Sequence, residues 1–168
     1  MANLRGLNDQ VFFTIDFNNI EQNNTEIWQH VNLSFNTLWS SLNIKSQVNT
    51  NHSLTTTANG NKIEITNFGT IVLCRKPTDE IQLLSDNITN LIQENISQFS
   101  FEPFEPSFEL NIKIIDAKQA TFLVEAYLDL TNFIDGFYLG DAIGMKFYIN
   151  RGSLITFNNE LIAQSQIS

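Results

Sequence analysis

The chain holds few side chains that commonly act as metal ligands, nucleophiles or acid–base catalysts at known spacings. His30 and His52 are its only histidines, and Cys74 is its only cysteine. Because no HExxH or CxxC motif accompanies them, the sequence predicts no metal site. Cys74 ends the apolar run Ile71-Val72-Leu73-Cys74, which predicts a buried thiol rather than a nucleophile assisted by a histidine.

Two other patterns resemble chemical sites without fitting them. Glu102 and Glu105 could act as a general acid and base, but each stands beside a proline on a predicted extended segment, where solvated or capping carboxylates are more common. Gly136, Gly140 and Gly144 recur every four residues between aspartates, a spacing that suits turns better than a phosphate site. We therefore predict no catalytic residue, no cofactor and no enzyme activity.

The net charge narrows the choice of partner. The protein has 168 residues and a net charge of −9, and residues 85–168 hold eleven acids against four bases. Because phosphate groups are bound by clustered lysines and arginines, we expect neither nucleic acid nor an anionic membrane as partner. A basic protein fits this charge, although acidity can also serve solubility alone.

The length fits one domain, which we place at residues 1–168. No apolar segment like that of an export signal follows the first residues, and no stretch approaches the roughly 18 apolar residues of a membrane span. We therefore expect a cytoplasmic protein that exists as a monomer or a weak homodimer.

Alternating apolar residues predict most of the strands. We expect strands at 11–17, ended by Asn18 and Asn19, at 31–36, and at 70–75. Asn59-Gly60, between 53–57 and 62–66, predicts a hairpin. Further strands are expected at the ranges 108–114, 121–130 and 142–149, the first two forming an antiparallel hairpin.

Two segments show helical periodicity instead. The helix at about 78–96 carries one apolar stripe, and the helix at about 153–164 begins at Ser153 as N-cap. Amphipathic strands with two helices predict an α+β fold, with six to eight mostly antiparallel strands covered by the helices on one face or at one edge.

The stretch FSFEPFEPSFELNIKII at 99–115 repeats Glu-Pro before a strand. Because proline cannot donate a hydrogen bond within a sheet, Pro103 and Pro106 predict an edge or crossover segment between the first helix and the strand at Phe108. The phenylalanines are expected to attach this segment to the core.

The connection near 130–141 is our best candidate for a partner-binding surface. Aromatic side chains beside carboxylates can anchor a basic partner. A solvated acidic turn with core aromatics is the simpler alternative, and the EF-hand spacing of a calcium site is absent. The candidate residues, with the two Glu-Pro carboxylates included, are Glu102, Glu105, Glu125, Asp129, Phe133, Asp135, Phe137, Tyr138 and Asp141.

The stretches 74–81 and 101–110 resemble a family of small bacterial immunity proteins, typified by the immunity protein to a wall-associated toxin. Members carry a similar Phe-x-Glu-Pro-x-x-Ser-Phe-Glu strand entry, and Trp28 and the terminal Leu154, Phe157 and Leu161 are also similar. Ile27 departs from the family, which tends to place an acid there.

This resemblance implies an antidote that binds the toxic C-terminal domain of a polymorphic or contact-dependent toxin and blocks its active site. Many such toxins are basic nucleases, which suits an acidic inhibitor. The alternative is a structural or adaptor domain of a phage or secretion system, whose acidity serves solubility alone.

Overall fold

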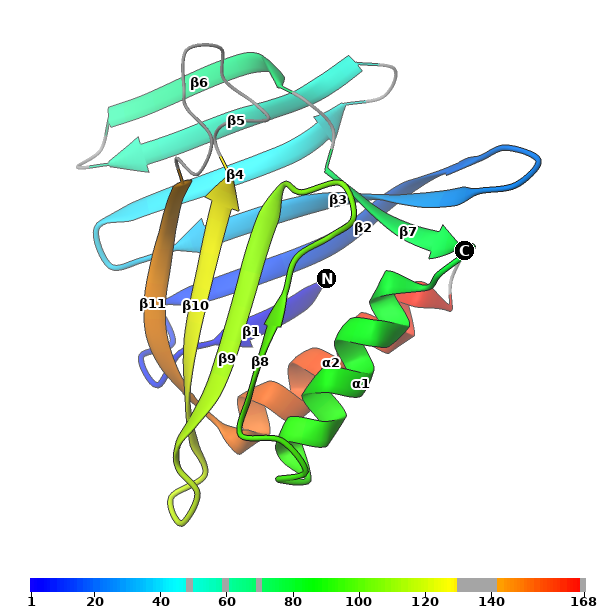
Figure 1. Cartoon of the computed structure of the whole chain (residues 1–168). Helices are drawn as coiled ribbons and strands as arrows, with labels where there is room; N and C mark the ends of the chain where they lie inside the picture. Colours follow the sequence, from blue (N-terminus) through cyan, green and yellow to red (C-terminus); the bar gives the residue numbers. More distant parts are fainter. Residues whose placement is uncertain (48–49, 59–60, 69–70, 130–141, 167–168) are drawn as a thin grey trace.

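The described residues form two antiparallel sheets and two helices around a shared core (Figure 1). The computed structural model describes residues 1–47, 50–58, 61–68, 71–129 and 142–166, and over 46–68 it describes the backbone alone. The predicted α+β class with mostly antiparallel sheet is therefore confirmed.

Sheet A has seven strands, six of them paired in chain order, while β7 pairs with the first half of β3. The second half of β3 pairs with β4, so β7 and β4 lie along the same edge of β3, one after the other. The strands of sheet A are β1 (Ala2–Arg5), β2 (Phe12–Gln22), β3 (Ile27–Asn36), β4 (Ser40–Gln47), β5 (Thr50–Ala58), β6 (Asn61–Phe68) and β7 (Val72–Lys76).

Sheet B has four strands in the order β11-β10-β9-β8, and its strands run across those of sheet A (Figure 1). One face of sheet B is apolar and faces the core, because alternate residues of each strand point to the same side. The strands of sheet B are β8 (Gln98–Phe101), β9 (Phe108–Asp116), β10 (Thr121–Asp129) and β11 (Ala142–Asn150).

The helices α1 (Glu80–Ile92) and α2 (Arg151–Ser165) contact each other and close one side of the core, and α2 packs on β1 (Figure 1). The Asp79 side chain caps α1 by accepting hydrogen bonds from two backbone N–H groups of the first turn. The predicted N-cap of α2 was wrong. Asn150 caps it, while the Ser153 hydroxyl donates to the backbone oxygen of Arg5 at 2.7 Å.

Phenylalanines from both sheets meet at the centre of the core. The ring of Phe13 lies 5.1 Å from that of Phe35 and 6.3 Å from that of Phe108, and Phe108 lies 6.0 Å from Phe101. These contacts join β2 and β3 of sheet A to β8 and β9 of sheet B. Such ring pairs add about 0.5–1.5 kcal/mol each beyond the area they bury.

Several strand predictions are confirmed and others need correction. The described residues contain eleven strands, more than the six to eight predicted, because β1, β4 and β8 were missed. β2 does not end at Asn18 and Asn19 but continues past a register shift to Gln22. The predicted Asn59-Gly60 turn lies outside the described residues, although β5 and β6 on either side of it pair as expected.

Among the described residues, neither helix is long and apolar enough to cross a membrane.

Candidate partner-binding site

The Glu-Pro segment, residues 102–107, connects β8 to β9. The prediction that it leads directly from the first helix was wrong, because β8 lies between the helix and the segment. Phe101 and Phe108, at its two ends, are buried in the core, as expected. Phe104, however, is 60% exposed. Glu102 and Glu105 lie between these two buried ends of the segment and are exposed.

A buried carboxylate holds this segment against the rest of the fold. The Glu80 side chain is 1% exposed and accepts hydrogen bonds from the backbone N–H groups of Cys74 and Phe104, each at 2.6 Å. Burial raises the pKa of the Glu80 carboxyl above its usual range, these two bonds oppose that effect, and repulsion from Glu105 adds to it. Glu80 therefore joins β7, α1 and the Glu-Pro segment.

Three carboxylates from separate parts of the chain line one pocket of about 290 Å³. Glu21 comes from the end of β2, Glu26 from the residue before β3, and Glu105 from the Glu-Pro segment. Trp28 and Val72 supply the apolar part of the pocket. We call this the Glu21/Glu26/Glu105 pocket.

The turn between β2 and β3 positions two of these carboxylates. The side chain of Asn23 accepts hydrogen bonds from the backbone N–H groups of Thr25 and Glu26, which fixes the turn. The Trp28 indole N–H donates to Glu26 at 3.1 Å, and His30 lies 3.2 Å from Glu21. The carboxylates are therefore oriented by their neighbours.

This arrangement suits a cationic side chain. Carboxylates attract ammonium and guanidinium groups, and the face of an indole ring adds a cation–π contribution of about 0.5–1 kcal/mol at an exposed site. Because the pocket is open to solvent, each single ion pair would contribute only about 0–1 kcal/mol. The charges would act together, mainly on specificity and on the rate of association.

Asp129 lies at the same end of sheet B as the Glu-Pro segment. Its backbone N–H donates to the backbone oxygen of Ser107 at 2.9 Å, so the end of β10 is attached to the start of β9. The structure thus brings Asp129 close to the segment of Glu102 and Glu105, with which the sequence analysis grouped it as a candidate partner-binding residue.

Glu125 lies elsewhere, on the outer face of sheet B. It forms an ion pair with Lys146 at 2.8 Å, and this hydrogen bond lowers the pKa of Glu125. Four residues of strand, about 13 Å, separate it from Asp129. The remaining predicted partner-binding residues, Phe133, Asp135, Phe137, Tyr138 and Asp141, lie outside the described residues.

The side chain of His52, one of those first considered for chemistry, lies outside the described side chains. Cys74 is buried, as predicted, and its thiol donates to the backbone oxygen of Lys76 at 3.2 Å. Within the described residues, no group of three or more His, Cys, Asp or Glu side chains could hold a metal ion.

Sequence reasoning missed Glu21, Glu26, Trp28 and Glu80 as site residues. A usable signal existed for the first two, because they enclose the polar turn Gln22-Asn23-Asn24-Thr25 between two amphipathic strands. No comparable signal marked Glu80, which looks like an ordinary acid in the first turn of a helix.

A comparison with models of known protein families finds no match for this chain, and a comparison with curated proteins finds no significant match.

Proposed function

We propose that the protein is an immunity protein that binds a basic toxin domain and blocks its active site. The observation that carries this proposal is the Glu21/Glu26/Glu105 pocket, in which carboxylates from β2, the β2–β3 turn and the Glu-Pro segment surround Trp28. The net charge of −9 supports a basic partner.

The pocket offers a defined way to bind such a domain. A lysine or arginine of the toxin would enter between the carboxylates and lie against the indole of Trp28. Glu102 lies close to Glu105 in the sequence, and Asp129 is hydrogen-bonded through its backbone to Ser107 at the end of the Glu-Pro segment. Both residues extend the negative surface around the pocket. Binding over this surface would cover basic residues that the toxin needs for contacting its own substrate.

The first test is rescue of growth. A susceptible bacterium would express the C-terminal domain of the protein encoded by the adjacent upstream gene, with and without this chain. We expect the domain alone to stop growth and its co-expression with this chain to restore growth. A toxic domain whose effect this chain does not relieve would contradict the proposal and favour a structural or adaptor role.

The second test asks whether the acidic pocket is responsible. The triple variant Glu21→Gln, Glu26→Gln, Glu105→Gln should lose rescue, because it removes three negative charges without removing apolar packing. A matched triple variant, Asp9→Asn, Asp86→Asn, Glu94→Gln, changes the same number of exposed charges outside the pocket and should retain rescue. Equal loss in both variants would show that net charge matters and the pocket does not.

A competing surface requires its own control. Trp39 is 79% exposed in the turn between β3 and β4, beyond the opposite end of β3 from Trp28. Exposed tryptophans often anchor protein interfaces. If the acidic pocket binds the toxin, Trp39→Ser retains rescue; loss of rescue in this variant alone would move the interface to the other end of β3.

A further inference from the structure

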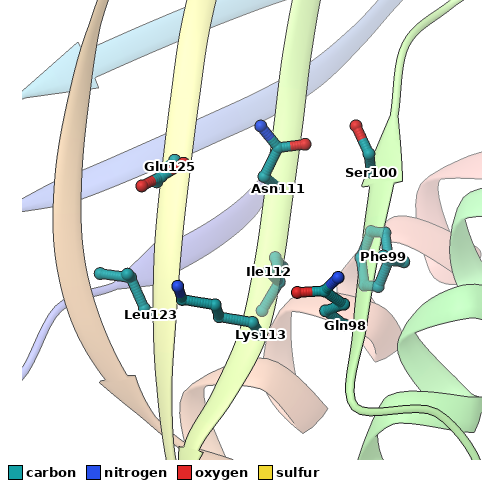
Figure 2. Close-up of a pocket in the computed structure, with 8 residues that line it drawn as sticks. All are labelled: Gln98, Phe99, Ser100, Asn111, Ile112, Lys113, Leu123 and Glu125. Carbon is teal, nitrogen blue, oxygen red and sulfur yellow. The ribbon is translucent and has the colours of Figure 1, made fainter.

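A second pocket, of about 440 Å³, lies on the outer face of sheet B, where residues of β8, β9 and β10 line it (Figure 2). Two neighbouring rows of cross-strand partners form it, one residue each from β8, β9 and β10. The first row is Ser100, Asn111 and Glu125, and the second is Gln98, Lys113 and Leu123.

The base of this pocket is apolar although it lies on the solvent side of the sheet. Leu123 is only 6% exposed, while the residues beside it in the row, Lys113 and Tyr148, are exposed. The pocket therefore combines a covered aliphatic surface with polar groups around it, which is the usual composition of a site for a small ligand group.

Asn111 supplies an acceptor without a partner. Its side-chain nitrogen donates to Glu109 at 2.7 Å, and because a carboxylate only accepts, this bond determines which end of the amide is the oxygen. The oxygen is shielded from solvent and has no hydrogen-bond partner among the described residues. Figure 2 shows it directed toward β8 and Ser100.

The charges of the pocket favour a neutral ligand. Lys113 and Glu125 both line it, and Glu125 already pairs with Lys146 at 2.8 Å. Lys113 and Glu125 carry opposite charges, so an ion of either sign would be attracted by one of them and repelled by the other. A ligand with a donor at one end and an acceptor at the other meets neither penalty.

The two rows also define the length of such a ligand. Asn111 on β9 and Gln98 on β8 are diagonal neighbours on adjacent strands, about 7–8 Å apart, which one planar amide bridges with a hydrogen bond of about 2.9 Å at each end. Its N–H would donate to Asn111, in the first row. Its oxygen would accept from the second row, where the Gln98 side-chain amide lies between β8 and β9 (Figure 2).

We propose that this pocket binds a neutral amide group, as found in a peptide bond or in an asparagine or glutamine side chain. The inference does not depend on the proposed function, since none of its residues lines the Glu21/Glu26/Glu105 pocket. In this site, Asn111 would accept a hydrogen bond from the N–H of the amide, and Gln98 would donate one to its oxygen.

Titrations followed by NMR test the proposal on the full chain. The probes are N-methylacetamide for a peptide group, propanamide for a side-chain amide, and N,N-dimethylacetamide, which has no N–H to donate. We expect saturable shifts at Asn111 and its neighbours with one or both N–H probes below about 200 mM, and none with N,N-dimethylacetamide. Which N–H probe binds identifies the source of the amide.

Variants separate a specific site from general solvation. Asn111→Leu keeps the size of the side chain and should weaken binding at least about tenfold, as expected for a lost hydrogen bond in a desolvated site. Asn158→Leu is the matched control, because the Asn158 oxygen is also buried without a partner but lies on α2. It should bind the probes like the wild type.

The exposed Gln98 provides a variant that is expected to fold in any case, and Gln98→Ala should weaken binding about threefold to tenfold. Three results would overturn the proposal: no saturable shifts, equal shifts with N,N-dimethylacetamide, or unchanged binding in both Asn111→Leu and Gln98→Ala.

Discussion

The Glu80 carboxylate and the backbone N–H of Phe104 form a hydrogen bond of 2.6 Å between the first turn of α1 and the middle of the Glu-Pro segment. The second Glu80 oxygen accepts from Cys74 on β7. This relationship shows how the Glu-Pro segment is held without pairing in a sheet. The prolines cannot take part in a sheet ladder, and the segment is held instead by a side chain from 24 residues earlier in the sequence.

Glu80→Ala is expected to destabilise the fold strongly. It leaves the N–H groups of Cys74 and Phe104 without their acceptor, and hydrogen bonds to a charged group contribute about 1.5–3 kcal/mol each. We expect the free energy of unfolding, measured by urea denaturation, to fall by about 3 kcal/mol or more. The exposed Glu102→Ala should change it by less than about 0.5 kcal/mol. A similar small change in both variants would contradict this account.

The raised pKa of Glu80 predicts a pH dependence of stability with a definite sign. At pH values between the ordinary glutamate pKa of 4.5 and the higher pKa of Glu80 in the folded state, the folded state binds this proton more tightly than the unfolded state. The free energy of unfolding must therefore decrease as the pH rises through this window. Glu80→Gln removes this contribution, so the difference in unfolding free energy, wild type minus variant, should decrease from about pH 4.5 upward. A difference that stays constant or increases would contradict the prediction.

Much of the fold could be predicted because the pattern was local. Val31, Leu33 and Phe35 alternate with polar residues in β3, and all three are buried, since a pleated strand turns successive side chains to opposite faces. The apolar stripe of α1 is buried for the corresponding reason, with a period of 3.6 residues. Such patterns need no knowledge of the rest of the chain.

The missed elements depend on distant partners. β1 is only four residues long and is stabilised by pairing with β2, where Ala2 lies opposite Ile15. β8 is similarly short and pairs with β9. The Glu21/Glu26/Glu105 pocket was missed for the same reason, because Glu105 joins the other two carboxylates only through the tertiary fold.

Gly144 of β11 should tolerate no side chain. A Cβ atom there would lie 2.2 Å from the backbone oxygen of Ala126 and 2.4 Å from the Tyr127 ring, because Tyr127 is its cross-strand partner. Gly144→Ala is therefore expected to lower the free energy of unfolding by about 1–3 kcal/mol or more. Gly152→Ala, in the first turn of α2, meets only the side-chain oxygen of the N-cap Asn150, at 3.3 Å, and should change the free energy of unfolding by less than about 1 kcal/mol in either direction. Thermal unfolding of the two variants compares them directly, and equal losses would refute the steric explanation.

The proposed inhibitor should associate with its toxin at a rate that depends on salt. A charge of −9 attracts a basic domain over a distance that shrinks from about 30 Å at 0.01 M salt to about 8 Å at 0.15 M. We expect the association rate constant, measured by stopped-flow fluorescence, to fall at least about tenfold across this range.

The variant Glu21→Gln, Glu26→Gln, Glu105→Gln should associate more slowly at low salt and show a weaker salt dependence. The matched variant Asp9→Asn, Asp86→Asn, Glu94→Gln should change both less, because its charges lie outside the pocket. A rate that does not change with salt would remove electrostatic attraction from the mechanism, and equal effects of the two variants would show that the pocket does not direct the encounter.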